Sequence, residues 1–351
     1  MKKLLMIIGL LLSIVLLSSC VNKNAVKPGD STPPETGTKL LTIKDYYAYQ
    51  ENVKYVYEGQ GNEYASSTVF IDYISGNRVQ LRSNNGGTEM VKVLENKDGE
   101  LGILLSGGEC YYRENFTQVP GSNVEILLKE PLTLGTSWTL ADGRKRSITN
   151  LEVNVTTPMG TYQTLEVTTE GKEDKTLDYY APNIGLVKSV FTSNGLEVSS
   201  TLSKLEASVP FIQTVRFYYP NANVDKLYYV NRELSFKTND LTKTKFENAF
   251  QDLPKGGLAK VLGPNAKIKS LFLNTDNVVY IDFTKELLSE MNAGSGYESL
   301  ILQSITNTIG TYYGVDKVYL TVEGNPYVSG HIAMKKGEFF TVNSKNSVEQ
   351  K

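Results

Sequence analysis

Few side chains in this sequence could perform nucleophilic or metal chemistry. The 351 residues include one histidine, His331, and two cysteines, Cys20 and Cys110. A structural zinc site needs four nitrogen or sulfur ligands, and these three side chains are too few. His331 is the only histidine available to a Ser–His–Asp or Cys–His enzyme, and no GxSxG, HExxH or P-loop pattern lies near it. We interpret it as a surface or internally satisfied histidine; a general base or pH sensor is the alternative.

Acidic residues offer a second kind of chemistry. Asp282 and Glu286 stand four positions apart, and Glu290 and Glu298 follow. Paired carboxylates can hydrolyse glycosidic bonds, which would suit a weak cell-wall enzyme. Asp282, however, ends a predicted strand, where an acid favours the N-terminus of the helix that follows, and Glu286 and Glu290 are typical of a solvated helix face. The sequence therefore predicts a protein that is not an enzyme and that has no cofactor and no metal.

The charge balance excludes a nucleic-acid partner. Hydrophobic residues make up 40% of the chain and charged residues 21%, which is ordinary globular composition, and the net charge is −2. Without Lys2 and Lys3, 34 basic side chains stand against 38 acidic ones, a net charge of −4. Both signs are scattered, and no basic face or tail is visible, so we expect no nucleic acid among the partners.

The first twenty residues indicate export and lipid attachment. A basic start, Met1-Lys2-Lys3, leads into an apolar run at residues 4–17 and then into Ser18-Ser19-Cys20. This is the pattern of a secretory signal, predicted here as residues 1–19, and the run is shorter than the roughly 20 residues of a membrane-spanning helix. Leu17-Ser18-Ser19-Cys20 also resembles a bacterial lipobox, in which the cysteine thiolate is alkylated with diacylglycerol.

Lipidation of Cys20 would place the protein on the extracytoplasmic face of the cell membrane. Two acyl chains, such as palmitate, give stable anchoring where one would be marginal. The alternative is an ordinary secreted protein with a chance cysteine. With Cys20 lipidated, Cys110 has no disulfide partner; we interpret it as a small buried residue in a strand, and a reactive thiol is the alternative.

The chain is predicted to form two domains behind a tether. Residues 20–40 are rich in Pro, Gly, Ser, Thr and Lys and are expected to be a disordered tether. Residues 41–208 alternate in polarity, with turn signals about every ten residues, which predicts an all-β antiparallel domain, a curved sheet or half-barrel. Tyrosine is abundant, 22 residues, and suits half-buried strands, although exposed aromatics could also bind glycans or partner surfaces.

The pattern of polar and apolar residues changes after Ser208-Val209-Pro210. From there the chain reads strand, strand, helix, strand, strand, helix, helix, strand, with a short helix expected from Thr284 and the best helix at residues 298–313, ended by Gly314. Ile301, Leu302, Ile305, Ile309 and Tyr312 form one apolar stripe on that helix. This order predicts an α/β sandwich with helices on one face of a small sheet, at residues 212–342, followed by a tail at 343–351.

Several phrases of this C-terminal part resemble the GerMN domain, the sporulation and spore-germination domain of lipoproteins of Gram-positive bacteria. They are VRFYYP at 215–220, VYIDFT at 279–284, ITNTI at 305–309, VDKV at 315–318 and VEG at 322–324. The resemblance implies a fold like that of ring-building motifs and a non-enzymatic role in sporulation or spore germination. Its partners would be the membrane, through the N-terminal lipid, and envelope or sporulation-complex proteins, with a homo-oligomer as one form of that assembly.

Two features favour an alternative function. The best-known sporulation member carries two GerMN domains in tandem, whereas the first half here is a β domain, and similar domains occur in lipoproteins outside sporulation, one type of which modulates a sensor kinase. Residues 179–187, YYAPNIGLV, resemble the closing phrase of half-barrel envelope proteins that often contact lipids. The alternative is therefore an envelope lipoprotein that binds a hydrophobic ligand or modulates a sensor kinase.

Overall fold

The computed structural model describes residues 41–121, 125–221, 223, 226–252, 256–345 and 347–350. The predicted signal at 1–19, the lipidation site Cys20 and the tether at 20–40 lie outside these residues. Residues 41–351 form one compact unit. Within the described part of the chain, no helix is both long and apolar enough to cross a membrane.

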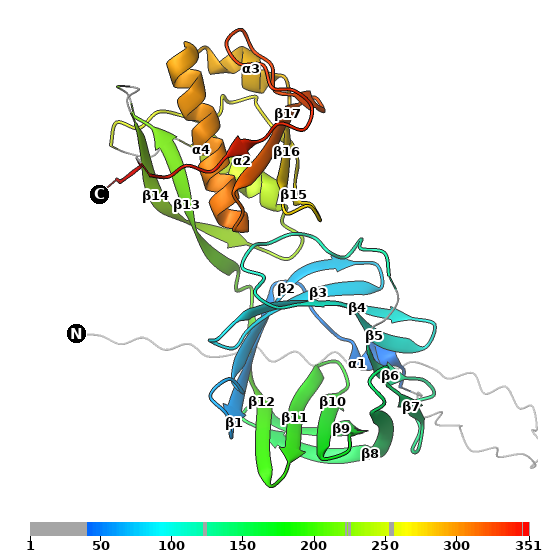
Figure 1. The fold of residues 1–351 in the computed structure, drawn as a ribbon. Coiled ribbons are helices and arrows are strands. Elements are labelled where there is room, and N and C mark those ends of the chain that lie inside the picture. Colours follow the sequence, from blue (N-terminus) through cyan, green and yellow to red (C-terminus); the bar gives the residue numbers. More distant parts are fainter. Residues whose placement is uncertain are drawn as a thin grey trace, which may run out of the picture. The chain divides into compact units, whose positions relative to one another are not determined.

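The first half is built from one large antiparallel sheet. After the short helix α1 (Ile43–Tyr46), twelve strands of the described chain join in the order β6-β5-β4-β3-β2-β1-β12-β11-β10-β9-β8-β7 and curl into a nearly closed, barrel-like sheet (Figure 1). The predicted curved antiparallel sheet is confirmed. The strands are β1 (Val53–Gln60), β2 (Ser67–Ser75), β3 (Arg78–Asn84), β4 (Glu89–Lys97), β5 (Glu100–Gly107), β6 (Glu125–Lys129), β7 (Ser137–Thr139), β8 (Lys145–Thr157), β9 (Gly160–Glu170), β10 (Asp174–Ala181), β11 (Gly185–Ser193) and β12 (Leu196–Ala207).

Local sequence explains both the hairpins and the curvature. Asp98-Gly99 connects β4 to β5 and Asn194-Gly195 connects β11 to β12, and all four residues have positive φ, as a two-residue hairpin turn of the primed type requires. Register shifts interrupt the ladders between β1 and β12, β2 and β3, β4 and β5, β5 and β6, β8 and β9, and β10 and β11. Such bulges bend strands and increase their twist, which is how one sheet curls back on itself.

The second half contains two sheets around a central helix. One sheet has the order β13-β14-β20 and the other β15-β16-β17-β18, with β19 paired to β17. The sequence predicts a single small sheet; this is wrong, because β14 pairs with β13 and β20 and makes no ladder with β15. The elements are β13 (Phe211–Pro220), β14 (Leu227–Phe236), α2 (Thr242–Gln251), β15 (Ile268–Leu273), β16 (Val279–Phe283), α3 (Glu286–Met291), α4 (Ser295–Tyr313), β17 (Lys317–Val322), β18 (Asn325–Pro326), β19 (Phe340–Thr341) and β20 (Val348–Glu349).

Helix α4 is buried on more sides than its apolar stripe predicts. Besides the isoleucines and leucine of the stripe, Thr306, Asn307 and Thr308 are fully buried. The Tyr218 N–H of β13 donates to Thr308 Oγ1 (2.9 Å), and Asn307 Nδ2 donates to the Asn343 carbonyl (2.8 Å). The Thr308 hydroxyl and the Asn307 amide thus satisfy backbone groups on both sides of α4. The Tyr313 hydroxyl at the end of the helix is buried and has no hydrogen-bond partner among the described residues.

The helix boundaries differ from those expected at two places. α3 begins at Glu286 rather than at Thr284, and α4 begins at Ser295, so the chain breaks between the helices at residues 292–294. Asn292 has left-handed backbone angles that end α3, and Gly294 is extended. Ser295 and Gly296 are tolerated because they occupy the exposed first turn of α4, where no tertiary packing depends on them.

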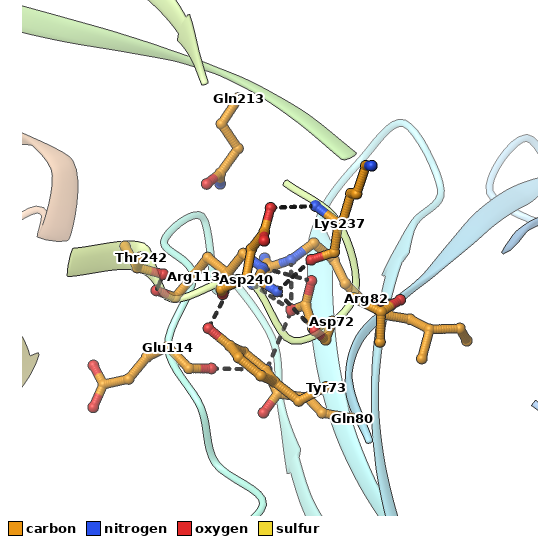
Figure 2. Close-up of polar contacts among 12 residues, drawn as sticks. Asp72, Tyr73, Gln80, Arg82, Arg113, Glu114, Gln213, Lys237, Asp240 and Thr242 are labelled. Carbon is orange, nitrogen blue, oxygen red and sulfur yellow. Dashed lines mark hydrogen bonds and ion pairs between the residues drawn. The ribbon is translucent and has the colours of Figure 1, made fainter. Parts of the chain in front are cut away.

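A buried ionic cluster joins the barrel-like sheet to the second half (Figure 2). Asp72 of β2 lies between two guanidinium groups: Arg82 Nη2 is 3.0 Å from its Oδ2 and Arg113 Nε 3.4 Å from its Oδ1, and all three side chains are 1% exposed. Arg113, on the β5–β6 connection, also donates to the carbonyls of Lys237 (3.2 Å) and Asp240. We call Asp72, Arg82 and Arg113 the joint.

Backbone contacts reinforce the joint. The Arg113 N–H donates to the hydroxyl of Tyr312 on α4 (2.8 Å), and the Thr242 hydroxyl at the start of α2 donates to the Arg113 carbonyl (2.7 Å). Tyr312 in turn donates to Gln213 Oε1 (2.8 Å). Tyr312 therefore contacts the joint as well as lying on the apolar stripe of α4, because its hydroxyl needs polar partners once it is buried.

We predict that Asp72→Asn destabilises the protein by about 3–5 kcal/mol, because it removes the carboxylate that the buried Arg113 pairs with and leaves Arg82 with Glu89 alone (2.9 Å). The measurement is urea unfolding of residues 20–351 carrying Cys20→Ala, followed by far-UV circular dichroism. Asp98→Asn is the matched control: its carboxylate is exposed and lies 4.0 Å from the exposed Lys97 ammonium, so stability should not change measurably. Equal stability of the two variants would contradict the role of the joint.

Candidate functional site

The barrel-like sheet encloses a cavity of about 380 Å³. Its walls come from alternate residues of neighbouring strands, as the two-residue period of a strand requires: Leu81 and Ser83 on β3, Lys92 and Leu94 on β4, and Leu101 and Ile103 on β5. The volume falls within the range of small-molecule sites. The remaining lining residues are Tyr46, Tyr49, Tyr57, Ser67, Val69, Glu125, Leu127, Arg146, Thr176, Asp178, Tyr180, Leu186, Ser189 and Ser200.

Four tyrosines give the cavity much of its aromatic wall. Burial raises the pKa of Tyr49, Tyr57 and Tyr180 above the usual value of a phenol. Tyr49 and Tyr57 nevertheless keep accessible surface, because they face the cavity rather than packed protein. The Tyr57 hydroxyl donates to the Leu186 carbonyl (2.9 Å), which fixes its ring against the wall. Other tyrosines of this tyrosine-rich chain belong to the core. Tyr218 and Tyr219, for example, are 1% and 0% exposed.

Side chains rather than a strand ladder close the barrel-like sheet. The sheet order ends at β6 and β7. Across this seam, Trp138 Nε1 donates to the Ile126 carbonyl (3.0 Å) and Arg146 Nη1 donates to the same oxygen (2.6 Å). Arg146 also pairs with Glu125 (2.7 Å) and donates to Thr169 Oγ1 (2.7 Å). A single buried guanidinium thus holds three strands at the cavity wall.

The charged lining includes one cation that makes no hydrogen bond or ion pair within the described chain. Asp178 accepts a hydrogen bond from the Ser189 hydroxyl (2.7 Å); its burial raises its pKa, while this bond and the charges of Arg146 and Lys92 lower it in part. Glu125 is paired with Arg146. Lys92 lines the cavity half-buried, and among the residues that the structure describes its ammonium has no hydrogen-bond or ion-pair partner.

Comparison with known proteins identifies the second half. Residues 216–328 match the family model Germane, described as sporulation and spore germination. These residues form a GerMN domain. The predicted resemblance is confirmed, and the matched residues run from β13 to the segment after β18; we call this part the GerMN region.

Solved structures also resemble parts of the chain. The tandem GerMN domains of the sporulation protein GerM from Bacillus subtilis are 20% identical over 35% of this chain and 45% of that one, with a TM-score of 0.27, so this chain spans less than half of that structure. A candidate lipoprotein from Clostridium perfringens is 18% identical over 38% and 88%, with a TM-score of 0.25. A candidate exported protein with a YmcC-like fold from Bacteroides fragilis is 13% identical over 45% and 96%, with a TM-score of 0.27. No curated protein matches the chain.

The carboxylates of the GerMN region do not form a catalytic pair. Asp282 accepts hydrogen bonds from the Thr321 hydroxyl (2.7 Å) and the Gly324 N–H (2.8 Å), so it joins β16 to the end of β17. The expectation that Asp282 serves the next helix N-terminus is therefore wrong: the parallel neighbour strand offers closer donors. Glu290 accepts from the Asn265 side chain (2.6 Å), and the described residues contain no cluster of three or more acidic, histidine or cysteine side chains able to hold a metal.

His331 lies beside Glu298 in a separate hollow of about 450 Å³. Glu298 is 3% exposed, and its Oε1 accepts from the hydroxyls of Tyr327 (2.8 Å) and Ser329 (2.5 Å). Ser329 Oγ also accepts from the His331 N–H (3.1 Å), a turn contact of the backbone. Within the described chain the imidazole makes no hydrogen bond to Ser329, so no nucleophile–base pair is assembled.

Cys110 is buried, as expected, but it lies on the β5–β6 connection and not in a strand. The reason is the joint: the Cys110 carbonyl accepts a hydrogen bond from Arg82 Nη1 (2.5 Å), which holds the connection against β3. Burial raises the pKa of the Cys110 thiol, and the charge of Arg82 lowers it in part. The protonated thiol is a poor nucleophile.

We predict that native Cys110 reacts with iodoacetamide at least about tenfold more slowly than unfolded Cys110, because the thiol is buried and protonated. The measurement uses residues 20–351 with Cys20→Ala, with and without urea. Ser106→Cys in a Cys110→Ala background is the control, since Ser106 is exposed on the adjoining strand β5 and a thiol there should react at once. Rapid native labelling of Cys110 would instead support the reactive-thiol alternative.

A second prediction concerns the seam. Arg146→Met should destabilise the protein by about 3 kcal/mol or more, because Glu125 loses its counter-charge and the Ile126 carbonyl loses a charged donor. The fluorescence of Trp138, the only tryptophan, should shift to longer wavelength as the seam opens. Arg144→Met is the matched control, since within the described chain its guanidinium forms an ion pair with the exposed Asp142 alone. Unaltered stability and fluorescence in Arg146→Met would show that the seam does not depend on this side chain.

Proposed function

We propose that this is a non-enzymatic, lipid-anchored protein of the cell envelope that acts in sporulation or spore germination through protein–protein contacts. The observation that carries the proposal is the Germane match of residues 216–328. The lipobox at Cys20 supports attachment to the extracytoplasmic face of the membrane. Partners would be envelope or sporulation-complex proteins, including further copies of the chain.

We further propose that the two halves are separate domains, with the GerMN region an α/β sandwich. Each half has its own apolar core. One comprises buried residues between Ile43 and Leu202, and the other comprises residues between Val215 and Tyr327. α4 lies in the second core between strands of both sheets, an arrangement that buries two sheet faces with one helix.

The cavity favours a second role for the β half, the binding of a hydrophobic ligand. Leucines, valine, isoleucine and tyrosines line it, and serine, threonine and charged side chains from several strands also face it, so the cavity offers both apolar surface and polar groups to a ligand. In this arrangement the β half holds the ligand and the GerMN region contacts the protein partner. The same cavity would serve a lipoprotein outside sporulation.

A deletion strain complemented with single variants tests the main proposal. The full chain should restore heat-resistant spores and their germination, and Cys20→Ala should not, because it lacks the anchor. Cys110→Ala is the matched control: it removes the other cysteine from a buried site without touching the anchor, and it should restore both.

Two outcomes would contradict the proposal. Unchanged spore counts and germination in the deletion strain would exclude the sporulation role. Full complementation by Cys20→Ala would exclude the anchor. Point variants are preferable to removal of the GerMN region, since that truncation would expose the joint and destabilise the β half.

A further inference from the structure

The cavity has two chemically different ends. Tyr46 and Leu94 lie toward α1, because the hydroxyl of Tyr47 on the same turn donates to the Leu94 carbonyl (3.2 Å). Ser67, Ser83 and Ser200 lie at the other end, where Ser67 is opposite Tyr57, Ser83 is opposite Val69 and Ser200 is opposite Gly59 of β1. Toward α1 the lining is apolar apart from the neutralised Glu125–Arg146 pair, since Ile103 is opposite both Leu94 and Glu125. Toward the far end of β1 it carries hydroxyls and Asp178, since Ser189 is opposite both Ser200 and Asp178.

Lys92 lies between these ends. Lys92 on β4 is opposite Leu81 on β3. The next residue of β3 that lines the cavity is Ser83, and the next of β4 is Leu94. Arg146 is neutralised by Glu125 at 2.7 Å. Asp178 accepts a hydrogen bond from Ser189, and the charge of Lys92 is among those that lower its pKa, although no hydrogen bond or ion pair joins Lys92 to Asp178. Among the described residues, the ammonium of Lys92 is therefore the cation of the wall without a directly bonded counter-charge.

The volume limits the size of a ligand. A cavity of about 150 Å³ holds a benzene molecule of six carbons, so 380 Å³ accommodates roughly 15 non-hydrogen atoms at the same filling. That is about the size of one 14-carbon acyl chain and is too small for two. An unpaired ammonium inside protein is costly, and an anionic group beside it removes that cost.

The geometry points to an amphipathic ligand with one acyl chain and an anionic head, its chain toward α1 and its head on Lys92. The inference rests on the second role proposed above, that the cavity holds a hydrophobic ligand, and adds the class of that ligand. A carboxylate and a phosphate monoester share the required chemistry. Lys92 is the residue that selects a ligand with a negatively charged head.

Four probes with the same 14-carbon chain test this, added below their micelle concentrations: myristate, tetradecyl phosphate, tetradecanol and tetradecyltrimethylammonium. The protein is residues 20–351 with Cys20→Ala, and binding is followed by calorimetry and by the fluorescence of Trp138. Myristate or tetradecyl phosphate should bind about tenfold or more tightly than tetradecanol. Comparing these two probes shows whether the head is a carboxylate or a phosphate.

Three variants locate the effect. Lys92→Met should weaken the anions about tenfold and leave tetradecanol within about twofold, because only the charged contact is removed. Lys204→Met is the matched control on an exposed position of β12 and should change nothing. Ser83→Phe fills the cavity and should abolish binding of all probes, and circular dichroism would verify its fold.

The failures are distinguishable. Equal binding of anions and tetradecanol, a preference for the ammonium probe, or indifference to Lys92→Met would overturn the anionic head while leaving a hydrophobic cavity. No binding of any probe would overturn both this inference and the second role proposed for the β half.

Discussion

The attraction of Asp72 for two buried guanidinium groups is the interaction on which the rest of the structure depends. A carboxylate and two arginines, each 1% exposed, are stable away from water only with their charges in contact and most of their other N–H groups bonded. Arg82 also pairs with Glu89, and the acceptor carbonyls belong to β2, to the β5–β6 connection and to the segment between β14 and α2. The cluster can be satisfied only if the β half and the GerMN region meet at this point.

Because the joint must be buried, the strands β2, β3 and β4 are covered on both faces of the sheet. On β3, Leu81 faces the cavity, while Gln80 and Arg82 on either side of it face the joint, at 0% and 1% exposure. On β4, Lys92 and Leu94 line the cavity, and Val91 and Val93 are buried on the opposite face. The cavity and the contact with the GerMN region therefore share one wall, a single sheet thick.

The elements that could be predicted from the sequence are those specified locally. Asp98-Gly99 and Asn194-Gly195 mark hairpins because backbone with positive φ demands those residues, and Gly314 with left-handed angles ends α4 for the same reason. The segments that resemble the GerMN domain could be recognised because their order along the chain follows these helices and strands. The joint and the seam could not be predicted, since Asp72, Arg82 and Arg146 read as solvent-facing charges on alternating strands. These side chains are buried only because segments distant in the sequence pack against the strands that carry them.

A shared wall limits what each half can do alone. Side chains in a packed interior shift together, because cores have few voids to absorb a displacement. A ligand that contacts Leu81 from within also presses on the strand that places Arg82 against Asp72. In the second role proposed for the β half, a bound ligand would therefore lie one residue along β3 from the joint, with a single sheet between it and the GerMN region.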